Sequence, residues 1–194
     1  MIFRARNTLT NQLLLILVAL YIATFFYPGL EEKLFLFNRA LLSDGKLHGV
    51  ATGEWYRLFT AGFLHAGLTH LLFNLMALYT LGTPFEMIYG RIRYGILLFV
   101  SLLGGSLASV TFNAENQPSV GASGAIFGLF GALLVMRKAL GADLRSTLAL
   151  LGINAVIAIV IPGIDWRAHL GGLLAGALAA LIFRVLPTKG SQNH

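Results

Sequence analysis

The sequence predicts an all-α integral membrane protein built from six membrane-spanning helices. Of its 194 residues, 57% are hydrophobic and only 11% are charged, whereas soluble domains carry about 25% charged residues. Its mean hydropathy is +0.77. The apolar residues gather in six stretches, and a helix that crosses a bilayer needs about 20 of them, within a range of about 17–25. We expect a single membrane domain over residues 1–194.

The first apolar stretch, 9–27, follows Arg4 and Arg6 and invites comparison with a secretory signal peptide. Its apolar run is longer than the about 7–15 residues of a signal-peptide core. The sequence Tyr27-Pro28-Gly29 after it lacks the small-residue pattern of a cleavage site. We therefore predict a first span that is retained.

A long segment that is only half polar separates the first span from the second. Its apolar run 34–42 is too short to cross a bilayer, which predicts a loop that is partly embedded in the membrane or lies at its surface. Trp55 and Tyr56 near its end are residue types that favour a membrane interface.

The other spans are predicted at 66–83, 93–112, 120–136, 146–161 and 168–186, followed by a disordered tail over 187–194. The fourth and fifth are short for a full crossing. A short helix fits if it starts below the membrane surface, with its entry loop shielded by protein or lining a wet cavity. The polar loop 113–118 leads directly into such a start, at Gly121-Ala122-Ser123-Gly124.

Lysine and arginine placement predicts the orientation, because these residues concentrate on the cytoplasmic side of membrane proteins. With a cytoplasmic N-terminus, nine of the 14 fall inside: Arg4, Arg6, Arg91, Arg93, Arg137, Lys138, Arg145, Arg184 and Lys189. Both termini are then cytoplasmic, and His65, Ser123 and His169 all lie toward the external side. The net charge of +6 needs no nucleic-acid partner, since the basic residues form no patch interleaved with aromatic residues.

Small residues give two of these spans a reason to pack closely. In the fourth span glycines recur every three or four residues, at Gly121, Gly124, Gly128 and Gly131, and the sixth span has His169, Gly172 and Gly176 at similar spacing. Faces of small residues let membrane helices approach each other. Most such faces serve packing alone. Here facing stripes would also bring Ser123 to His169.

A serine beside a histidine has the chemistry of nucleophilic catalysis, because imidazole can take the hydroxyl proton. Free backbone amides in the first helical turn could hold an oxyanion near Ser123. His70 and Asn74 are four residues apart, share a helix face and could add donors. Ser123 could also cap its helix. Asp165, four residues before His169, could orient that imidazole or cap the sixth span.

A metal site is the competing interpretation of these histidines. His65, His70 and His169 with Glu86 could be imagined as ligands, but their spacing is not the His-Glu-x-x-His pattern of zinc enzymes. Glu86 also falls on the cytoplasmic side in the predicted topology. The chain has no cysteine, so thiolate ligands and thiolate catalysis are excluded. We expect no metal and no cofactor.

Taken together and in order, these motifs resemble the rhomboid family of intramembrane serine proteases, in its compact six-span bacterial form. The motifs are Trp55-Tyr56-Arg57, His65, His70-x-x-x-Asn74, Gly82-x-x-x-Glu86, Gly121-x-Ser123-Gly124 and Ala168-His169 with Gly172 and Gly176. The match covers nearly the whole chain after the first span.

The resemblance implies a Ser–His dyad that requires no acid. Ser123 would attack a peptide carbonyl and His169 would act as the base, with an oxyanion held by the Ser123 amide, His70 and Asn74. Gly121 and Gly124 would shape the substrate contact and the packing, as Gly128 does in the same stripe. Trp55, Arg57, His65 and Glu86 would be structural, with Arg57 in the first loop and Glu86 in the loop after span two.

The resemblance also implies the substrates: transmembrane segments of membrane proteins, cut near the external side of a bacterial cytoplasmic membrane. Two alternatives remain. A non-proteolytic rhomboid-like factor that binds membrane helices would be expected to lack Ser123 or His169, and both are present. A transporter or proton channel would place polar residues along a path through the bilayer, whereas here they gather on one side.

Overall fold

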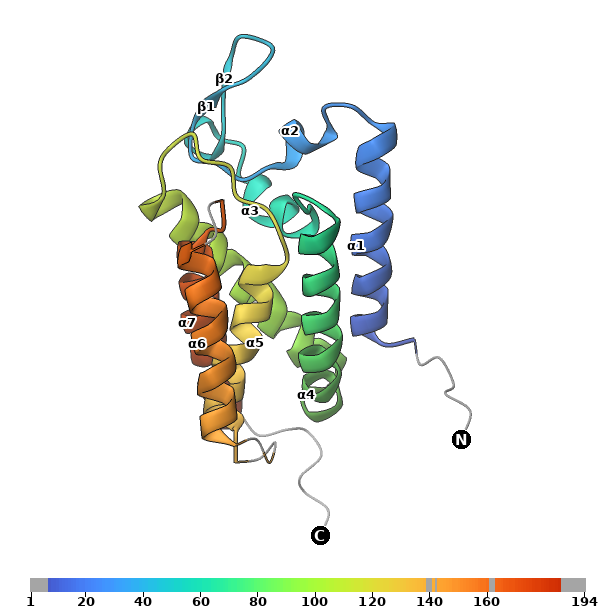
Figure 1. Cartoon of the computed structure of the whole chain (residues 1–194), viewed down its shortest axis with the longest axis vertical. Coiled ribbons are helices and arrows are strands. Elements are labelled where there is room, and N and C mark those ends of the chain that lie inside the picture. The colour runs from blue at the N-terminus through green and yellow to red at the C-terminus, as the bar shows by residue number, and fades with distance from the viewer. Residues whose placement is uncertain (1–6, 139–140, 142, 161–162, 186–194) are drawn as a thin grey trace.

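The computed structural model describes residues 7–138, 141, 143–160 and 163–185, and these form a bundle of helices (Figure 1). The long helices are α1 (Leu9–Phe26), α4 (Leu68–Phe112), α5 (Ser123–Met136), α6 (Leu144–Val160) and α7 (Trp166–Val185). This agrees with the predicted helical membrane fold. The predicted tail 187–194 lies outside the described residues.

Helix α4 contains both the second and the third predicted spans. Its helical geometry breaks at Gly90, with φ 71° and ψ 166°, and there the chain turns back toward the loop-bearing end of the bundle (Figure 1). The second span was predicted to stop at 83, before Pro84, but the helix continues past it. Proline is tolerated in membrane helices because neighbouring groups satisfy the backbone that it disturbs. The sequence prediction that Glu86 lies in a loop was therefore wrong.

Capping aspartates explain why two helices begin earlier than predicted. Asp143, directly before α6, accepts the N–H of Ser146 at 2.9 Å. Asp165, directly before α7, accepts the N–H groups of Arg167 and Ala168 at 3.1 Å each. Such caps satisfy N–H groups that have no partner within the helix. The predicted starts at 146 and 168 each fall two residues late.

Three of the described helices, α1, α4 and α7, are long and apolar enough to cross a membrane, while α5 and α6 contain shorter apolar segments. Large apolar side chains on their outer faces are exposed, including Phe25 (70%), Phe73 (64%) and Ile92 (78%). An apolar surface of this extent suits contact with lipid.

The core lies where α5 packs against α7 and α4. Tyr94, Leu97, Leu129 and Ala180 are fully buried in it. Helix α1 packs against α4, where the Glu86 carboxylate accepts the N–H groups of Leu9 (2.6 Å) and Thr10 (2.9 Å) and the Thr10 hydroxyl (2.7 Å). A carboxylate at a helix start is favoured by the free N–H groups and the helix dipole, so Glu86 fixes the start of α1.

The segment between α1 and α4 contains α2 (Leu30–Leu34), β1 (Ala40–Leu41), β2 (Leu47–His48), η1 (Val50–Thr52), α3 (Arg57–Thr60) and η2 (Ala61–Phe63). The strands β1 and β2 pair antiparallel, with Ala40 opposite His48 and Leu41 opposite Leu47. This loop sits over the end of the bundle where α4, α5 and α7 begin (Figure 1).

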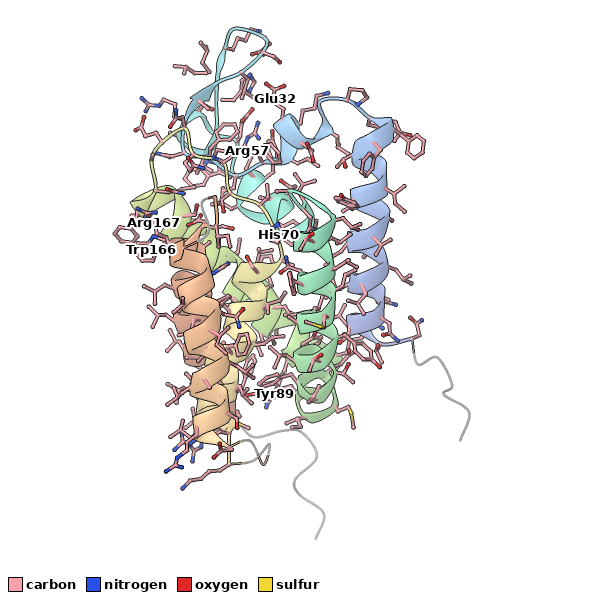
Figure 2. The ribbon with its side chains drawn as sticks, in the orientation of Figure 1. Glu32, Arg57, His70, Tyr89, Trp166 and Arg167 are labelled. Carbon is pink, nitrogen blue, oxygen red and sulfur yellow. The ribbon has the colours of Figure 1, made fainter. Side chains whose placement is uncertain are left out.

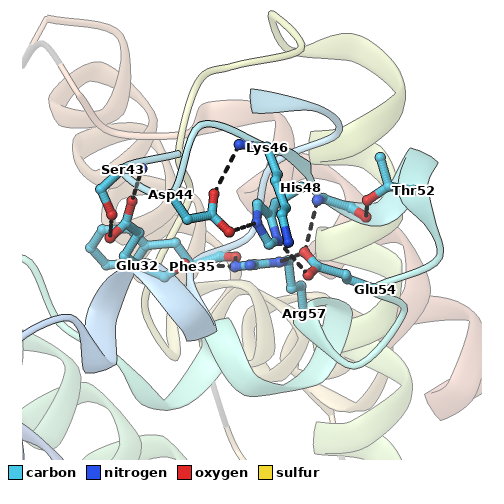
Figure 3. Close-up of polar contacts among 10 residues, drawn as sticks. Glu32, Phe35, Ser43, Asp44, Lys46, His48, Thr52, Glu54 and Arg57 are labelled. Atoms are coloured by element: carbon cyan, nitrogen blue, oxygen red, sulfur yellow. Dashed lines mark hydrogen bonds and ion pairs between the residues drawn. The ribbon is translucent and has the colours of Figure 1, made fainter. Parts of the chain in front are cut away.

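Arg57 ties the loop together and is only 1% exposed. Its guanidinium donates to the Glu54 carboxylate at 2.6 Å and to the main-chain oxygens of Glu32 (2.9 Å) and Phe35 (2.8 Å). It also lies 4.5 Å from the ring centroid of Phe37. Figure 3 shows the polar contacts of Arg57 in this cluster. Because the five N–H donors of an arginine can reach several acceptors at once, one side chain joins separate turns of the loop.

His48 extends the same cluster toward solvent. Its ring nitrogens lie 2.8 Å from Glu54 and 2.9 Å from Asp44 (Figure 3). Hydrogen bonds to Glu54 and Asp44 raise the pKa of His48 above its ordinary value of 6.5. Burial alone would raise the pKa of Glu54, but hydrogen bonds from His48, Arg57 and the Gly49 N–H outweigh it and lower that pKa to about 2. Sequence reasoning missed Glu54 and His48.

Candidate active site

Ser123 and His169 are in hydrogen-bond contact, with 2.9 Å between Ser123 Oγ and His169 Nε2. Ser123 is the first residue of α5, and His169 lies in the first turn of α7. Both side chains are half-buried. Residues 46 positions apart in the sequence thus meet at the loop-bearing end of the bundle. The residue before Ser123, Ala122, is the N-cap of α5, so the suggestion that Ser123 caps this helix was wrong by one position.

Glycines let α5 and α7 approach closely enough for this contact. A Cβ built on Gly172 would overlap the main chain of Gly124, and one built on Gly176 would overlap the main chain of Gly128. No side chain fits between the helices at these levels, so main chain packs directly on main chain. We call this contact the glycine seam, defined by Gly124, Gly128, Gly172 and Gly176.

The second half of α4 also packs against the glycine seam. Sequence reasoning missed this contact. A Cβ on Gly105 would approach the Ala168 oxygen to 2.7 Å and the Gly124 Cα to 3.3 Å. The sequence carried a signal for this contact in Ser101, Gly105 and Ser109, because small residues four positions apart in a membrane helix mark close packing.

Phe127 holds the His169 ring and was not predicted. The two rings are stacked with centroids 4.0 Å apart and planes 9° apart. Phe127 lies four residues after Ser123, so both side chains project from the same face of α5. That spacing is the sequence signal, but an aromatic residue in an apolar helix is usually a core residue, and Phe127 is indeed buried.

His70, in the first turn of α4 (Figure 2), lies against Gly121 and close to Ser123. A Cβ on Gly121 would come within 2.7 Å of His70 Cε1 and 2.8 Å of its Nε2, and within 3.7 Å of Ser123 Oγ. Gly121 has φ +118°, a conformation that residues with a Cβ rarely adopt. Glycine here therefore serves both the local turn and the approach of the imidazole to the serine.

Asn74 and His65 flank His70. Asn74 is buried and donates through Nδ2 to the His70 main-chain oxygen at 3.0 Å. His65, which precedes α4, is 1% exposed, and its ring centroid lies 5.1 Å from that of His70. Neither ring nitrogen of His65 has a hydrogen-bond partner.

Asp165 caps α7 and does not contact the imidazole. Its Oδ1 accepts the two N–H groups at the start of α7, while its Oδ2 and the His169 Nδ1 are buried without a hydrogen-bond partner. Of the two roles considered for Asp165, the capping role is the one observed. His169 therefore has Ser123 and Phe127 as its neighbours, and no carboxylate bonds to its second nitrogen.

The remaining predicted residues lie away from the Ser123–His169 pair. Trp55 is at the loop and is 64% exposed. Glu86 is hydrogen-bonded to the start of α1. It lies near the Gly90 end of the first half of α4, whereas His70 lies at the opposite end of that half, so Glu86 does not join the histidines. Within the part of the chain that the structure describes, no three His, Asp or Glu side chains gather closely enough to hold a metal ion.

Comparison with known proteins assigns this arrangement to a family. A model of the Rhomboid domain matches residues 52–185, which include every element that carries the site. The chain belongs to the rhomboid family. Together with its long apolar helices, this makes the protein an integral membrane protein.

Several rhomboid relatives are similar over much of this chain. Rhomboid protease GluP of Bacillus subtilis (strain 168) is 40% identical over 150 residues, which cover 73% of this chain and 28% of the relative. RHOMBOID-like protein 1 of Arabidopsis thaliana is 40% identical over 148 residues, covering 73% and 38%. Putative rhomboid protease YdcA of B. subtilis (strain 168) is 36% identical over 139 residues, covering 69% and 70%. The chain thus spans well under half the length of the first two relatives.

Proposed function

We propose that this rhomboid is an intramembrane serine protease that uses Ser123 and His169 as a catalytic dyad. The observation that carries the proposal is the 2.9 Å contact between Ser123 Oγ and His169 Nε2. A serine hydroxyl becomes an effective nucleophile when a base within hydrogen-bond reach can take its proton. The protease names of two relatives at 40% and 36% identity support the same activity.

The proposed reaction has two steps. Ser123 Oγ attacks the peptide carbonyl while His169 Nε2 takes its proton, and the imidazolium gives that proton to the leaving amine. Water then attacks the acyl-enzyme, with His169 as the base, and releases the new carboxyl end. Phe127 keeps the ring in place through both transfers, since it stacks on the imidazole face and leaves Nε2 free.

The oxyanion is assigned to the Ser123 backbone N–H and the His70 side chain, with Asn74 as a further donor. Helix α5 begins at Ser123, so the N–H groups of its first turn have no partner within the helix. His70 is supported by its position over Gly121. Asn74 would have to exchange its bond to the His70 oxygen for one to the substrate.

We assign the helices to six spans, with α4 supplying two of them across the reversal at Gly90 and the loop between α1 and α4 partly embedded. We also propose that both termini are cytoplasmic, which the distribution of lysine and arginine supports. The dyad then opens to the external side, where the ends of transmembrane substrates would enter. A single rhomboid domain over 1–194 and a bacterial cytoplasmic membrane belong to the same proposal.

A fluorophosphonate probe tests the dyad, because it reacts with activated serines. We expect labelling of the protein in its native membrane, and loss of labelling and of cleavage of a reconstituted transmembrane substrate in Ser123→Ala. His169→Ala should lose at least about 1,000-fold in rate, since members of such a unit act together. Cleavage that persists in Ser123→Ala would refute the proposal. Absence of labelling and cleavage in the unmodified, folded protein would favour a non-proteolytic rhomboid.

A further inference from the structure

A cavity lies at the end of the bundle opposite Ser123 and His169. It has a volume of about 440 Å³ and is lined by Val135, Met136, Arg137, Lys138 and Arg184. These residues come from the end of α5 and the last turn of α7. At about 1.5 Å per helical residue, the cavity is about 20 Å from Ser123 along α5. A volume in the range of about 300–1,000 Å³ is typical of ligand sites.

Within the described part of the chain, no carboxylate neutralises the three cationic side chains in this cavity. All eight Asp and Glu residues of the chain fall within the described part, and none lies within ion-pair distance of Arg137, Lys138 or Arg184. The one hydrogen bond from these side chains within that part is from Arg137 to the Leu134 oxygen at 3.1 Å. The Lys138 and Arg184 side chains are exposed. The cavity therefore offers about three positive charges to an anion.

The helix ends do not reverse this charge. Both α5 and α7 finish at the cavity with their C-termini, each of which carries about −0.5 of an elementary charge. Three cations exceed the two ends by about two charges. The local charge therefore remains positive and favours an anionic ligand.

An apolar strip beside the cavity identifies the kind of anion. Leu178, Leu181 and Val185 recur along one face of α7, and they are 59%, 49% and 80% exposed. Leu181 lies three residues before Arg184, so the strip reaches the side of α7 that carries Arg184. A phospholipid matches both features, since its phosphate can meet the cations while its acyl chains cover the strip. Basic pockets between helices at the membrane surface suit anionic headgroups.

We propose that this cavity binds the phosphate of an anionic phospholipid, which then bridges the ends of α5 and α7. The chemistry at the cations is that of a phosphate, which could also come from solution. The apolar strip favours the lipid source. The proposal concerns a site remote from the dyad and does not depend on the protease activity.

Lipid retention in native mass spectrometry tests the proposal on the full chain in neutral detergent. We expect retention of phosphatidylglycerol over phosphatidylcholine, and a roughly 100-fold weaker affinity in Arg137→Gln/Lys138→Gln/Arg184→Gln, because each cation near a membrane surface contributes about 1 kcal/mol. The matched control is Lys33→Gln/Arg39→Gln/Lys46→Gln, which removes the same charge from exposed loop positions and should keep wild-type affinity. The single variant Arg184→Gln should bind phosphatidylglycerol about five-fold more weakly. Because Arg184 is exposed, this variant tests the site even if the triple variant does not fold.

Three outcomes would overturn the proposal. Equal retention of phosphatidylglycerol by the cavity variants and the unmodified protein would exclude these cations as the binding site. Equal retention of phosphatidylcholine would exclude selection for an anionic headgroup. Inorganic phosphate that displaces phosphatidylglycerol at equal concentration would assign the cavity to a soluble anion and not to a lipid.

Discussion

The His169 imidazole is oriented by a ring and not by a carboxylate. Its Nε2 contacts Ser123 Oγ at 2.9 Å, Phe127 lies flat against one face, and its Nδ1 has no hydrogen-bond partner. Stacking restrains the tilt of the imidazole plane, which is what the contact with the serine requires. In the proposed dyad, an aromatic side chain would take the orienting role that an acid has in a three-residue triad.

Removing this ring should slow catalysis more than it weakens substrate binding. Stacked aromatic pairs contribute about 0.5–1.5 kcal/mol beyond their burial, so Phe127→Leu should lower kcat about two- to ten-fold with little change in KM. Steady-state kinetics on a reconstituted substrate measures both. Phe130→Leu is the control, because it changes a buried phenylalanine of the same helix that packs on Phe127. Equal kcat losses in the two variants would contradict an orienting role.

Sequence reasoning reached some of these residues and not others for a physical reason. Ser123, His169 and His70 stand out because polar groups are costly among apolar helices. Phe127 does not stand out, since its type is expected there. Glu54 and His48 lie in a loop where charged residues are common. Only the geometry shows that they support the buried Arg57.

Among the elements, the glycine seam sets the distance between α5 and α7. Its existence was predictable from the spacing of Gly124, Gly128, Gly172 and Gly176. That α4 also packs against this seam was not predictable. Several stretches of the chain contain small residues, and the sequence does not show which of these stretches are in contact. Nor could it show that α4 continues as a helix beyond Pro84.

Replacing a glycine of the seam by alanine should be more destabilising than the same replacement at a helical glycine outside the seam. In Gly176→Ala the added Cβ would overlap the Gly128 main chain, whereas at Gly152 in α6 it meets nothing within 4 Å. We expect Gly176→Ala to destabilise the protein by about 2–3 kcal/mol through overpacking and to reduce cleavage. Gly152→Ala should be neutral or stabilise by up to about 1 kcal/mol through helix propensity. Thermal unfolding in detergent measures both, and similar midpoints for the two variants would rule out the seam.

The loop cluster should make the loop sensitive to pH. The pKa of His48 is raised above 6.5 by its hydrogen-bond partners. Its contribution to the stability of the loop is therefore complete below pH 6.5 and is lost as the pH rises through the raised pKa. The pKa of Glu54 is lowered from 4.5 to about 2, so its contribution is complete above 4.5 and is lost as pH falls toward 2. Loop stability should therefore be greatest between 4.5 and 6.5.

Trp55 can report the pH dependence of loop stability. The chain has two tryptophans, and Trp166→Phe leaves Trp55, in the loop, as the only one. Its fluorescence should show an unfolding midpoint that declines above the raised pKa of His48. His48→Gln in the same background should remove that decline. A decline that persists in His48→Gln would show that another group is responsible.

For the whole molecule, composition and periodicity were sufficient to predict the helical membrane fold, since a chain this apolar has few other ways to satisfy its backbone. The ends of the helices were less predictable. They depend on caps such as Asp143 and Asp165 and on the single reversal at Gly90, each of which is set by one or two residues and not by a long pattern.

The absence of cysteine from the sequence makes the proposed orientation easy to test. Lys46→Cys in the loop should react with a membrane-impermeant maleimide in intact cells. Lys138→Cys at the opposite end should react only after the membrane is opened. Both side chains are exposed, so burial does not explain a difference. Reaction of Lys138→Cys in intact cells, with Lys46→Cys protected, would mean that the protein lies the other way round.

The glycine seam also determines at which stage the positions of Ser123 and His169 relative to each other are fixed. Side chains that position catalytic groups lose rotamer freedom, and mobile ones must lose it again each time a substrate binds. Main-chain atoms have no rotamers, and at Gly172 and Gly176 main chain alone separates α7 from α5. The spacing of the helices that carry Ser123 and His169 is therefore fixed once, when the helices assemble. In the proposed reaction, each catalytic cycle would then start from a pair that is already in place.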